Sequence, residues 1–202
     1  MNEFEARISR NREEKKRTET IEAGLRSQLE ARLLVIGREA LEFMSEHDLR
    51  KPTTVWRPPP RVKWTFTKTA LFSKRGEWAA SLTGSSHQMY ALLPPWPVML
   101  TDQGEWREVR QVTDLAPAET LGIGAAPRVN FLIDSGPVSA EFRLNGRGEL
   151  TTTLGLPELG VTYDPSHWYL RFTPDGQIGS TYGSHFVQVE EQLADAFNQQ
   201  LK

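Results

Sequence analysis

The clearest pattern of apolar and polar positions lies between Ile21 and Met44. Apolar residues recur there in steps of four and three, at Ile21, Leu25, Leu29, Leu33, Ile36, Ala40 and Phe43. This spacing places their side chains on one stripe of an α-helix. No proline interrupts the segment, and Pro52 stops the pattern shortly after it. We therefore predict one continuous amphipathic helix.

The residues ahead of this stripe are highly charged and include few apolar side chains. Pairs such as Glu3 with Arg7 have the spacing that supports a helix, so residues 2–20 predict a solvated helical extension. The coiled-coil-like stripe fits packing within the chain as well as pairing with another chain. Because the extension has little of its own to bury, the pattern favours a protein partner or a second copy. The predicted partner-binding residues are Ile21, Leu25, Leu29, Leu33, Ile36 and Phe43.

The rest of the chain has the pattern of short strands. Val62 to Thr67 alternates apolar and polar residues, as a half-buried strand does, and Glu77 to Leu82 returns as the second strand of a hairpin. Further apolar segments are separated by turns rich in Gly, Pro and Asn. A second amphipathic helical pattern, with Val189, Leu193 and Phe197 on one face, closes the chain.

These patterns together predict an α+β protein. It has a long N-terminal amphipathic helix, a mostly antiparallel β-sheet or sandwich, and a C-terminal helix that covers one face of the sheet. We divide the chain into an N-terminal helical segment at 1–48, a Pro-rich basic linker at 49–61, and an antiparallel β-domain with its covering helix at 62–202. Three consecutive prolines at 58–60 favour an extended, stiff spacer in the linker.

Composition narrows the class of protein without identifying its chemistry. Hydrophobic residues make up 38% of the 202 residues and charged residues 25%, which fits a folded, soluble protein. The absence of cysteine excludes disulfides and thiolate chemistry. No apolar run is long enough to span a bilayer, and the N-terminus has no hydrophobic signal region. We therefore expect a cytoplasmic protein that does not contact a membrane.

Candidate catalytic or metal-binding residues are few and scattered. The histidines are far apart in the sequence and do not have the spacing of a metal site. Whether His87, His167 and His185 converge in a pocket of the folded chain remains open. The sequence also lacks a convincing nucleophile motif, phosphate-binding loop or dinucleotide fingerprint. We therefore predict no catalytic residues, no metal and no cofactor, and hence a protein that is not an enzyme.

The net charge of −2 conceals one strongly basic segment. Residues 49–76 carry eight Lys or Arg and no acid, interleaved with aromatic side chains. Basic groups contact phosphates and aromatic rings stack on unpaired bases, so this segment raises the possibility of single-stranded nucleic-acid binding. In the alternative, the aromatic residues point into the core and the cations coat an exposed strand face. The possible nucleic-acid-binding residues are Arg57, Arg61, Lys63, Trp64, Lys68, Lys74 and Arg75.

The leading functional hypothesis is a non-catalytic assembly or adaptor protein. It would act through protein–protein contacts of the N-terminal helix and of the basic edge of the β-domain. Two alternatives stay open at this point, namely a single-stranded nucleic-acid-binding protein and a β-domain that binds a small ligand. A closed barrel with a large apolar cavity would support the second alternative.

Overall fold

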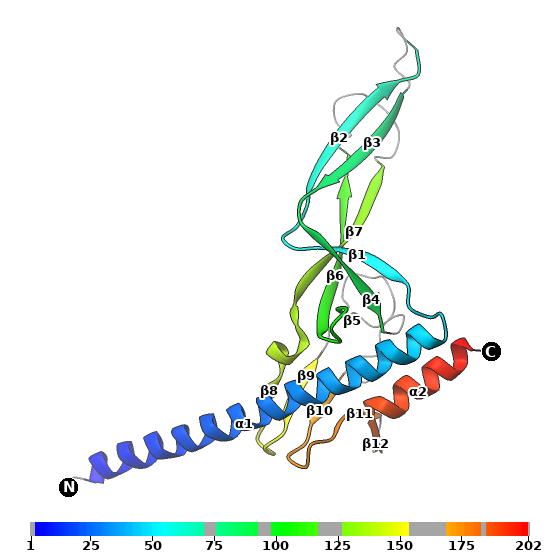
Figure 1. The fold of residues 1–202 in the computed structure, drawn as a ribbon. Helices are drawn as coiled ribbons and strands as arrows, with labels where there is room; N and C mark the ends of the chain where they lie inside the picture. The colour runs from blue at the N-terminus through cyan, green and yellow to red at the C-terminus, as the bar shows by residue number, and fades with distance from the viewer. Residues whose placement is uncertain are drawn as a thin grey trace.

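The computed structural model describes residues 3–70, 76–92, 98–116, 127–153, 169–182 and 185–201. It confirms the predicted α+β class. A long helix, α1 (Glu3–Glu46), comes first, strands follow, and a shorter helix, α2 (Val189–Gln200), lies near the end of the chain (Figure 1). The 44-residue α1 joins the predicted extension and the predicted amphipathic segment without a break.

The middle of the chain forms a closed five-stranded barrel. Its strands follow the order β1-β4-β5-β6-β7, and β1 pairs with β7 in parallel while the other pairs are antiparallel. The interior is filled by the apolar side chains of Val55, Met89, Met99, Val109 and Leu132. The bounds are β1 (Pro52–Trp56), β4 (Ser86–Ala91), β5 (Val98–Leu100), β6 (Trp106–Leu115) and β7 (Arg128–Pro137).

The first barrel strand lies in the segment predicted to be a linker. Val55, the fourth residue of this strand, is fully buried in the barrel. Pro52 occupies the first position of the strand, where a missing N–H is tolerated. The prediction of a spacer over 49–61 was therefore wrong for Pro52–Trp56. Burial of Val55 inside the barrel holds these residues in a strand despite the neighbouring prolines.

A two-stranded arm is inserted between β1 and β4. It consists of β2 (Arg61–Lys68) and β3 (Gly76–Thr83), paired from Arg61 with Thr83 to Lys68 with Gly76. This confirms the predicted hairpin. Figure 1 shows the arm extending away from the barrel on the side far from α1.

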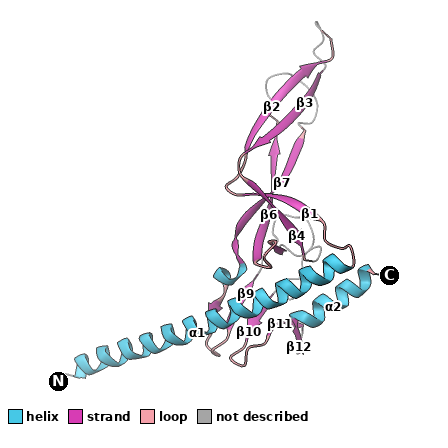
Figure 2. Ribbon diagram, in the orientation of Figure 1, coloured by secondary structure: helices cyan, strands magenta, loops and turns pink. Residues whose placement is uncertain are grey.

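A second antiparallel sheet completes the β-structure. Its strand order is β12-β11-β10-β9-β8, and the 3-10 helix η2 (Val138–Glu141) leads into it from β7. Figure 2 shows α1 and α2 side by side along this sheet. The strands are β8 (Arg143–Leu144), β9 (Leu150–Thr153), β10 (Tyr169–Phe172), β11 (Ile178–Tyr182) and β12 (His185–Gln188).

The main core joins both helices, the second sheet and one end of the barrel. The buried apolar residues of α1 in this core are Leu25, Leu29, Leu33, Ile36, Ala40, Leu41 and Met44. The sheet contributes Leu150, Leu170, Phe172 and Ile178, and α2 contributes Val189, Leu193 and Phe197. The apolar stripe of α1 is therefore covered by its own chain from Leu25 onward.

The contact between α1 and the barrel depends on a very close backbone approach. A Cβ atom added at Gly37 would run into the carbonyl oxygen of Gly104 and would lie 2.9 Å from Nε1 of Trp106. Gly104 has a positive φ of 83° in the turn before β6, a conformation that favours glycine. Glycine at position 37 thus lets the helix lie directly on this turn.

Candidate functional site

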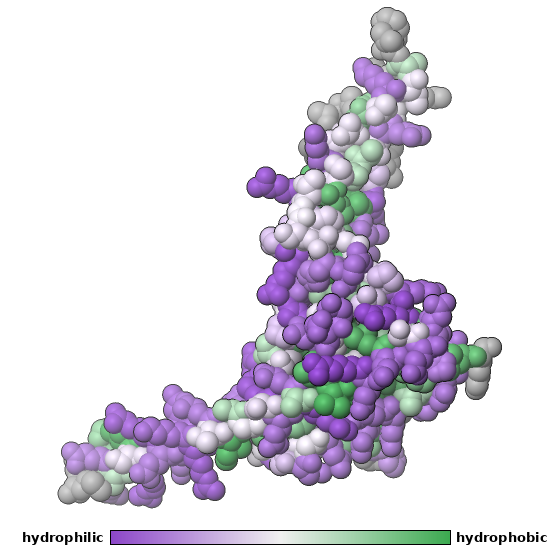
Figure 3. Space-filling model, viewed as in Figure 1, coloured by the Kyte–Doolittle hydropathy of each residue, from purple (hydrophilic) through white to green (hydrophobic). Residues whose placement is uncertain are grey.

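Half of α1 projects beyond the sheets that the structure describes. Leu25 is the first buried residue of the helix, and residues 3–24, called the projecting segment, lie ahead of it. At 1.5 Å per residue their length is about 33 Å. Figure 3 shows that this segment is mainly hydrophilic, with hydrophobic residues near its N-terminal end.

The structure separates the residues predicted to bind a partner into two groups. Leu25, Leu29, Leu33 and Ile36 are buried in the core of the chain itself, and Phe43 stacks on Phe197 of α2 with ring centroids 5.1 Å apart. The prediction that Leu25, Leu29, Leu33 and Ile36 face a partner is corrected, because they pack in the core of the chain itself. Phe43 is half-buried, and its predicted role stays a prediction. Ile21 is different, since 47% of it is exposed.

The projecting segment adds two apolar side chains that the sequence-based prediction did not include. Phe4 is 68% exposed and Ile8 is 37% exposed, one helical turn apart near the N-terminus. They lack the regular stripe that marked the buried part of α1. A contact surface on this segment would therefore combine the separate apolar side chains of Phe4, Ile8 and Ile21 with charge.

Charges in the projecting segment are arranged with opposite signs about a point close to its middle. This point lies between Glu14 and Lys15, and most charged residues at equal distances from it have opposite charges. Only Arg12 and Arg17 break the rule. The opposed residues are Arg7 and Glu22, Arg10 and Glu19, Glu13 and Lys16, and Glu14 and Lys15.

The β2–β3 arm carries the aromatic part of the predicted nucleic-acid site. Trp78 contacts both Trp64 and Phe66, with ring centroids 6.4 Å and 5.2 Å apart, and all three rings are half-buried. Because strand residues alternate in direction, Arg61 and Lys63 lie on the opposite, exposed face. The cations at 61 and 63 therefore do not share a surface with the rings.

The remaining predicted nucleic-acid-binding residues are also dispersed. Lys68 is the cation of β2 that shares the aromatic face, at the far end of the strand. Lys74 and Arg75 lie outside the described residues. Arg57 lies at the base of the arm, in a different environment described next. Single-stranded nucleic-acid binding remains a prediction. Among the described residues of this set, Lys68 is the one cation on the same strand face as the rings.

Four charged or titratable side chains meet at one end of the barrel. We call Arg57, His87, Arg107 and Asp134 the barrel-end cluster. Asp134 is its centre, with only 2% of its side chain exposed, and Arg107 beside it is 11% exposed. The outer members are Arg57, at 58%, and His87, at 39%. The cluster therefore has a buried ion pair at its base and two basic groups that reach solvent.

Strand pairing explains why these residues meet. Leu132 belongs to the barrel interior, and Asp134, two residues further along β7, points to the same face. The parallel pairing of Trp56 with Ile133 continues by one residue to bring Arg57 beside Asp134. A β-bulge between β6 and β7 shifts the register next to Asp134, where Arg107 reaches it from β6.

The carboxylate of Asp134 is fully used as an acceptor. Its Oδ1 accepts hydrogen bonds from Nε of Arg107 at 3.1 Å and from the backbone N–H of Gly136 at 3.0 Å. Its Oδ2 accepts from Nη2 of Arg107 at 2.8 Å and from Nη1 of Arg57 at 3.5 Å. These four bonds fill the acceptor positions that a carboxylate offers. The Nε2 atom of His87, 3.6 Å from Oδ2, lies just beyond them.

The histidines do not converge in a shared pocket among the described residues. His87 belongs to the barrel-end cluster, whereas His185 is exposed on β12 of the second sheet. His167 lies outside the described residues. Within the part of the chain that is described, no three His, Asp or Glu side chains are placed to hold a metal ion.

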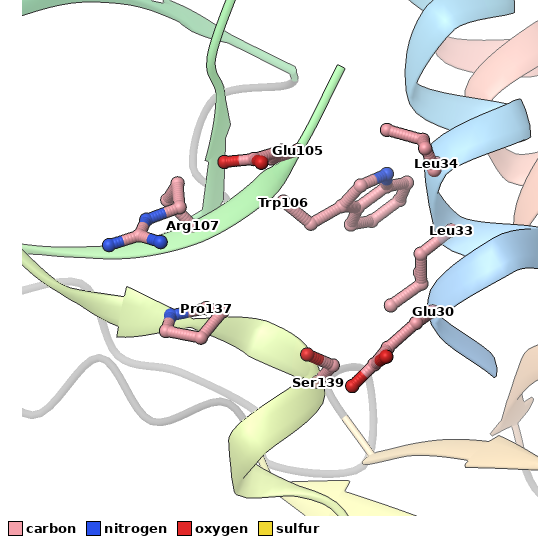
Figure 4. Close-up of a pocket in the computed structure, with 8 residues that line it drawn as sticks. All are labelled: Glu30, Leu33, Leu34, Glu105, Trp106, Arg107, Pro137 and Ser139. Carbon is pink, nitrogen blue, oxygen red and sulfur yellow. The ribbon is translucent and has the colours of Figure 1, made fainter. Parts of the chain in front are cut away.

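A cleft of about 350 Å³ lies beside the contact between α1 and the barrel (Figure 4). Leu33, Leu34 and Trp106 supply its apolar wall, and Glu30 and Glu105 bring carboxylates to it from the two sides. Arg107 lines the cleft with its stem, but its guanidinium points away from Trp106 (Figure 4). The full lining is Glu30, Leu33, Leu34, Glu105, Trp106, Arg107, Pro137 and Ser139.

This arrangement bears on the small-ligand alternative. The barrel is closed, as that alternative required, but side chains such as Met89 and Val109 fill its interior. The cleft against α1 lies outside the barrel wall. A ligand held inside the barrel therefore has no support, and small-ligand binding in general remains a prediction.

Comparisons with other proteins add no family assignment. No family model, curated protein or solved structure matches the chain. Among the described residues, no helix is long and apolar enough to cross a membrane.

Proposed function

We propose that the protein is a non-catalytic assembly protein that pairs with a second copy of itself through the projecting segment of α1. The observation that carries this proposal is the exposure of about 22 helical residues beyond the core, among them the apolar Ile8 and Ile21. In proteins most helical stability comes from packing of a helix face, and pairing would supply that packing to the projecting segment. The cytoplasmic location predicted from the sequence is the setting we propose for this assembly.

Charge complementarity supports a second copy in antiparallel orientation. In an antiparallel pair centred between Glu14 and Lys15, residues at equal distances from the centre lie at the same level. Arg10 then lies at the same level as Glu19 of the other copy, and most of the remaining charges are matched in the same way. In a parallel pair each charged residue would lie level with the same residue of the other copy, so every such pair of like charges would be repulsive.

The length of the projecting segment fits the same arrangement. With the centre at Glu14 and Lys15, Glu3 of one copy reaches the level of Arg26 of the other, where α1 enters the folded body. Ile8 reaches the level of Ile21. The two bodies thus lie at opposite ends of the pair, and the exposed apolar side chains near each end lie at matching levels.

Size-exclusion chromatography with light scattering tests the proposal on the full chain. We expect a concentration-dependent dimer that Ile21→Glu weakens by tenfold or more, on the order of the burial of one large apolar side chain. Val35→Glu is the matched control, because Val35 is 44% exposed on the same helix but lies outside the projecting segment. A monomer at all concentrations, or equal effects of the two substitutions, would contradict the proposal.

A further inference from the structure

The barrel-end cluster contains more positive than negative charge. Arg57 and Arg107 both contact Asp134, and no second carboxylate pairs with either guanidinium among the described residues. The excess persists whichever protonation state His87 adopts. A partly buried group of this kind favours binding of an anion, because nearby protein surface weakens the screening by water.

The two exposed members of the cluster have hydrogen-bonding capacity that Asp134 does not use. Arg57 has five N–H donors, and its side chain directs one of them, Nη1, to Asp134 in a long bond of 3.5 Å. His87 is 3.6 Å from the same oxygen, whose acceptor positions are occupied by the two arginines. Donors of Arg57 and His87 are therefore available to a ligand at the open side of the cluster.

The buried members hold this site in place. Arg107 donates two hydrogen bonds to Asp134, and Asp134 also accepts from the backbone of Gly136, so the base of the cluster is rigid. The backbone N–H of Arg57 donates to the carbonyl of Ser85 at 3.1 Å, which fixes the start of its side chain. Pre-organised donors of this kind bind an anion with little loss of conformational freedom.

We propose that the barrel-end cluster is an oxyanion-binding site, in which Arg57 and His87 hold a phosphate group. An arginine fork suits the oxygens of phosphate, and the imidazole adds a donor from the neighbouring strand. The phosphate could be inorganic or part of a nucleic-acid backbone, and the chemistry of recognition is the same in both. This site is separate from the projecting segment and does not depend on pairing between copies.

Isothermal titration calorimetry of the full chain with sodium phosphate, at constant ionic strength, tests the proposal. We expect binding that Arg57→Gln and His87→Gln each weaken by about tenfold or more, the effect of losing one hydrogen bond to a charged group. Arg110→Gln is the matched control, since Arg110 is 65% exposed on β6 and pairs only weakly, with Glu108 at 3.8 Å. It should leave binding unchanged.

A second titration, with an oligothymidylate, distinguishes the two sources of phosphate. Tighter binding of the oligonucleotide that inorganic phosphate competes away would support the site and assign it to a nucleic-acid backbone. Tighter binding of inorganic phosphate would support the site and assign it to a free anion. Failure of both probes to bind, or binding that survives Arg57→Gln and His87→Gln with the fold intact by circular dichroism, would overturn the proposal.

Discussion

Arg107 and Asp134 form a two-pronged ion pair inside the end of the barrel, with Nε 3.1 Å from Oδ1 and Nη2 2.8 Å from Oδ2. Both side chains are almost fully removed from water. Burial of each charge is unfavourable by itself, and each is stabilised by the other. The pair therefore makes the stability of the barrel sensitive to the loss of either partner.

Removal of Asp134 alone should destabilise the protein strongly. In Asp134→Leu the guanidinium of Arg107 stays buried without a counter-charge, which typically costs about 3–5 kcal/mol of unfolding free energy. Urea unfolding measures this loss. The double variant with Arg107→Met removes both charges and should be clearly more stable than the single variant. Equal unfolding free energies of the single and double variants would contradict this account.

Replacing each of two glycines of α1 with alanine should change the stability of the protein in opposite directions. Alanine is favoured over glycine in a helix by about 1 kcal/mol, so Gly24→Ala, whose Cβ would meet nothing within 4 Å, should stabilise the protein. Gly37→Ala should destabilise it, because the new methyl group would collide with Gly104 and push the helix off the barrel. Thermal unfolding of the two variants checks the prediction, and a stabilised Gly37→Ala would show that the contact can relax.

Glu108 should make the stability depend on pH. Burial raises the pKa of the Glu108 carboxyl above its usual value, the charge of Arg110 lowers it in part, and Glu141 raises it. The folded state therefore binds a proton more tightly than the unfolded state does. Stability falls as the pH rises from the unfolded pKa through the raised folded pKa, and above that window the penalty is constant.

The substitution Glu108→Gln removes this titrating group and isolates its effect. The variant should gain stability relative to the original chain near neutral pH, and the gain should disappear in acid below the usual carboxyl pKa, where Glu108 is protonated in both states. Urea unfolding over a series of pH values measures the difference. A difference that stays constant with pH would show that the Glu108 carboxyl does not carry the effect.

Charge exchange should reveal the orientation of the proposed helix pair. Glu13 and Lys16 lie about 60° apart around the helix, so both can face the other copy. In the antiparallel arrangement Glu13→Lys places two cations at the same level, so it should weaken the dimer. Adding Lys16→Glu to the same chain should restore it, which sedimentation equilibrium can measure. In a parallel pair the second change would restore nothing, because each position would still lie level with an identical charge.

A distance measurement provides an independent check of that orientation. The sequence has no cysteine, so Ala6→Cys introduces a single site for a spin label. In the antiparallel pair residue 6 lies level with residue 23 of the other copy, which separates the two labels by about 26 Å along the axis. Pulsed electron resonance should detect that separation, whereas a parallel pair would bring the labels close together.

Local periodicity was sufficient to predict the helices and the arm. The three-and-four spacing from Ile21 to Phe43 predicted a helix that α1 contains, and alternation from Val62 to Thr67 predicted β2. It could not show what covers the stripe. That depends on residues such as Phe197, which lie far along the chain and contribute nothing to the local pattern.

Closure of the barrel and the barrel-end cluster depend on contacts between distant strands. The parallel pairing of Val55 with Leu132 joins segments with no shared motif, and Val55 lies next to a proline-rich stretch that resembles a spacer. The sequence contains one weak indication of Asp134. This charged residue directly follows the apolar run Phe131–Ile133, where the strand pattern predicts side chains that point into the core. Without the strand order, no pattern connects it with Arg57 or His87.

The cover of α1 by α2 has a consequence for synthesis of the chain. The ribosome synthesises Leu29 and Met44 long before Phe197, which lies 153 residues after Met44 in the sequence. At 5–20 residues per second that interval is roughly 8–30 s. During this time α2 is not yet available to cover the apolar face of α1. Nascent chains are thus most prone to aggregation before their last helix emerges.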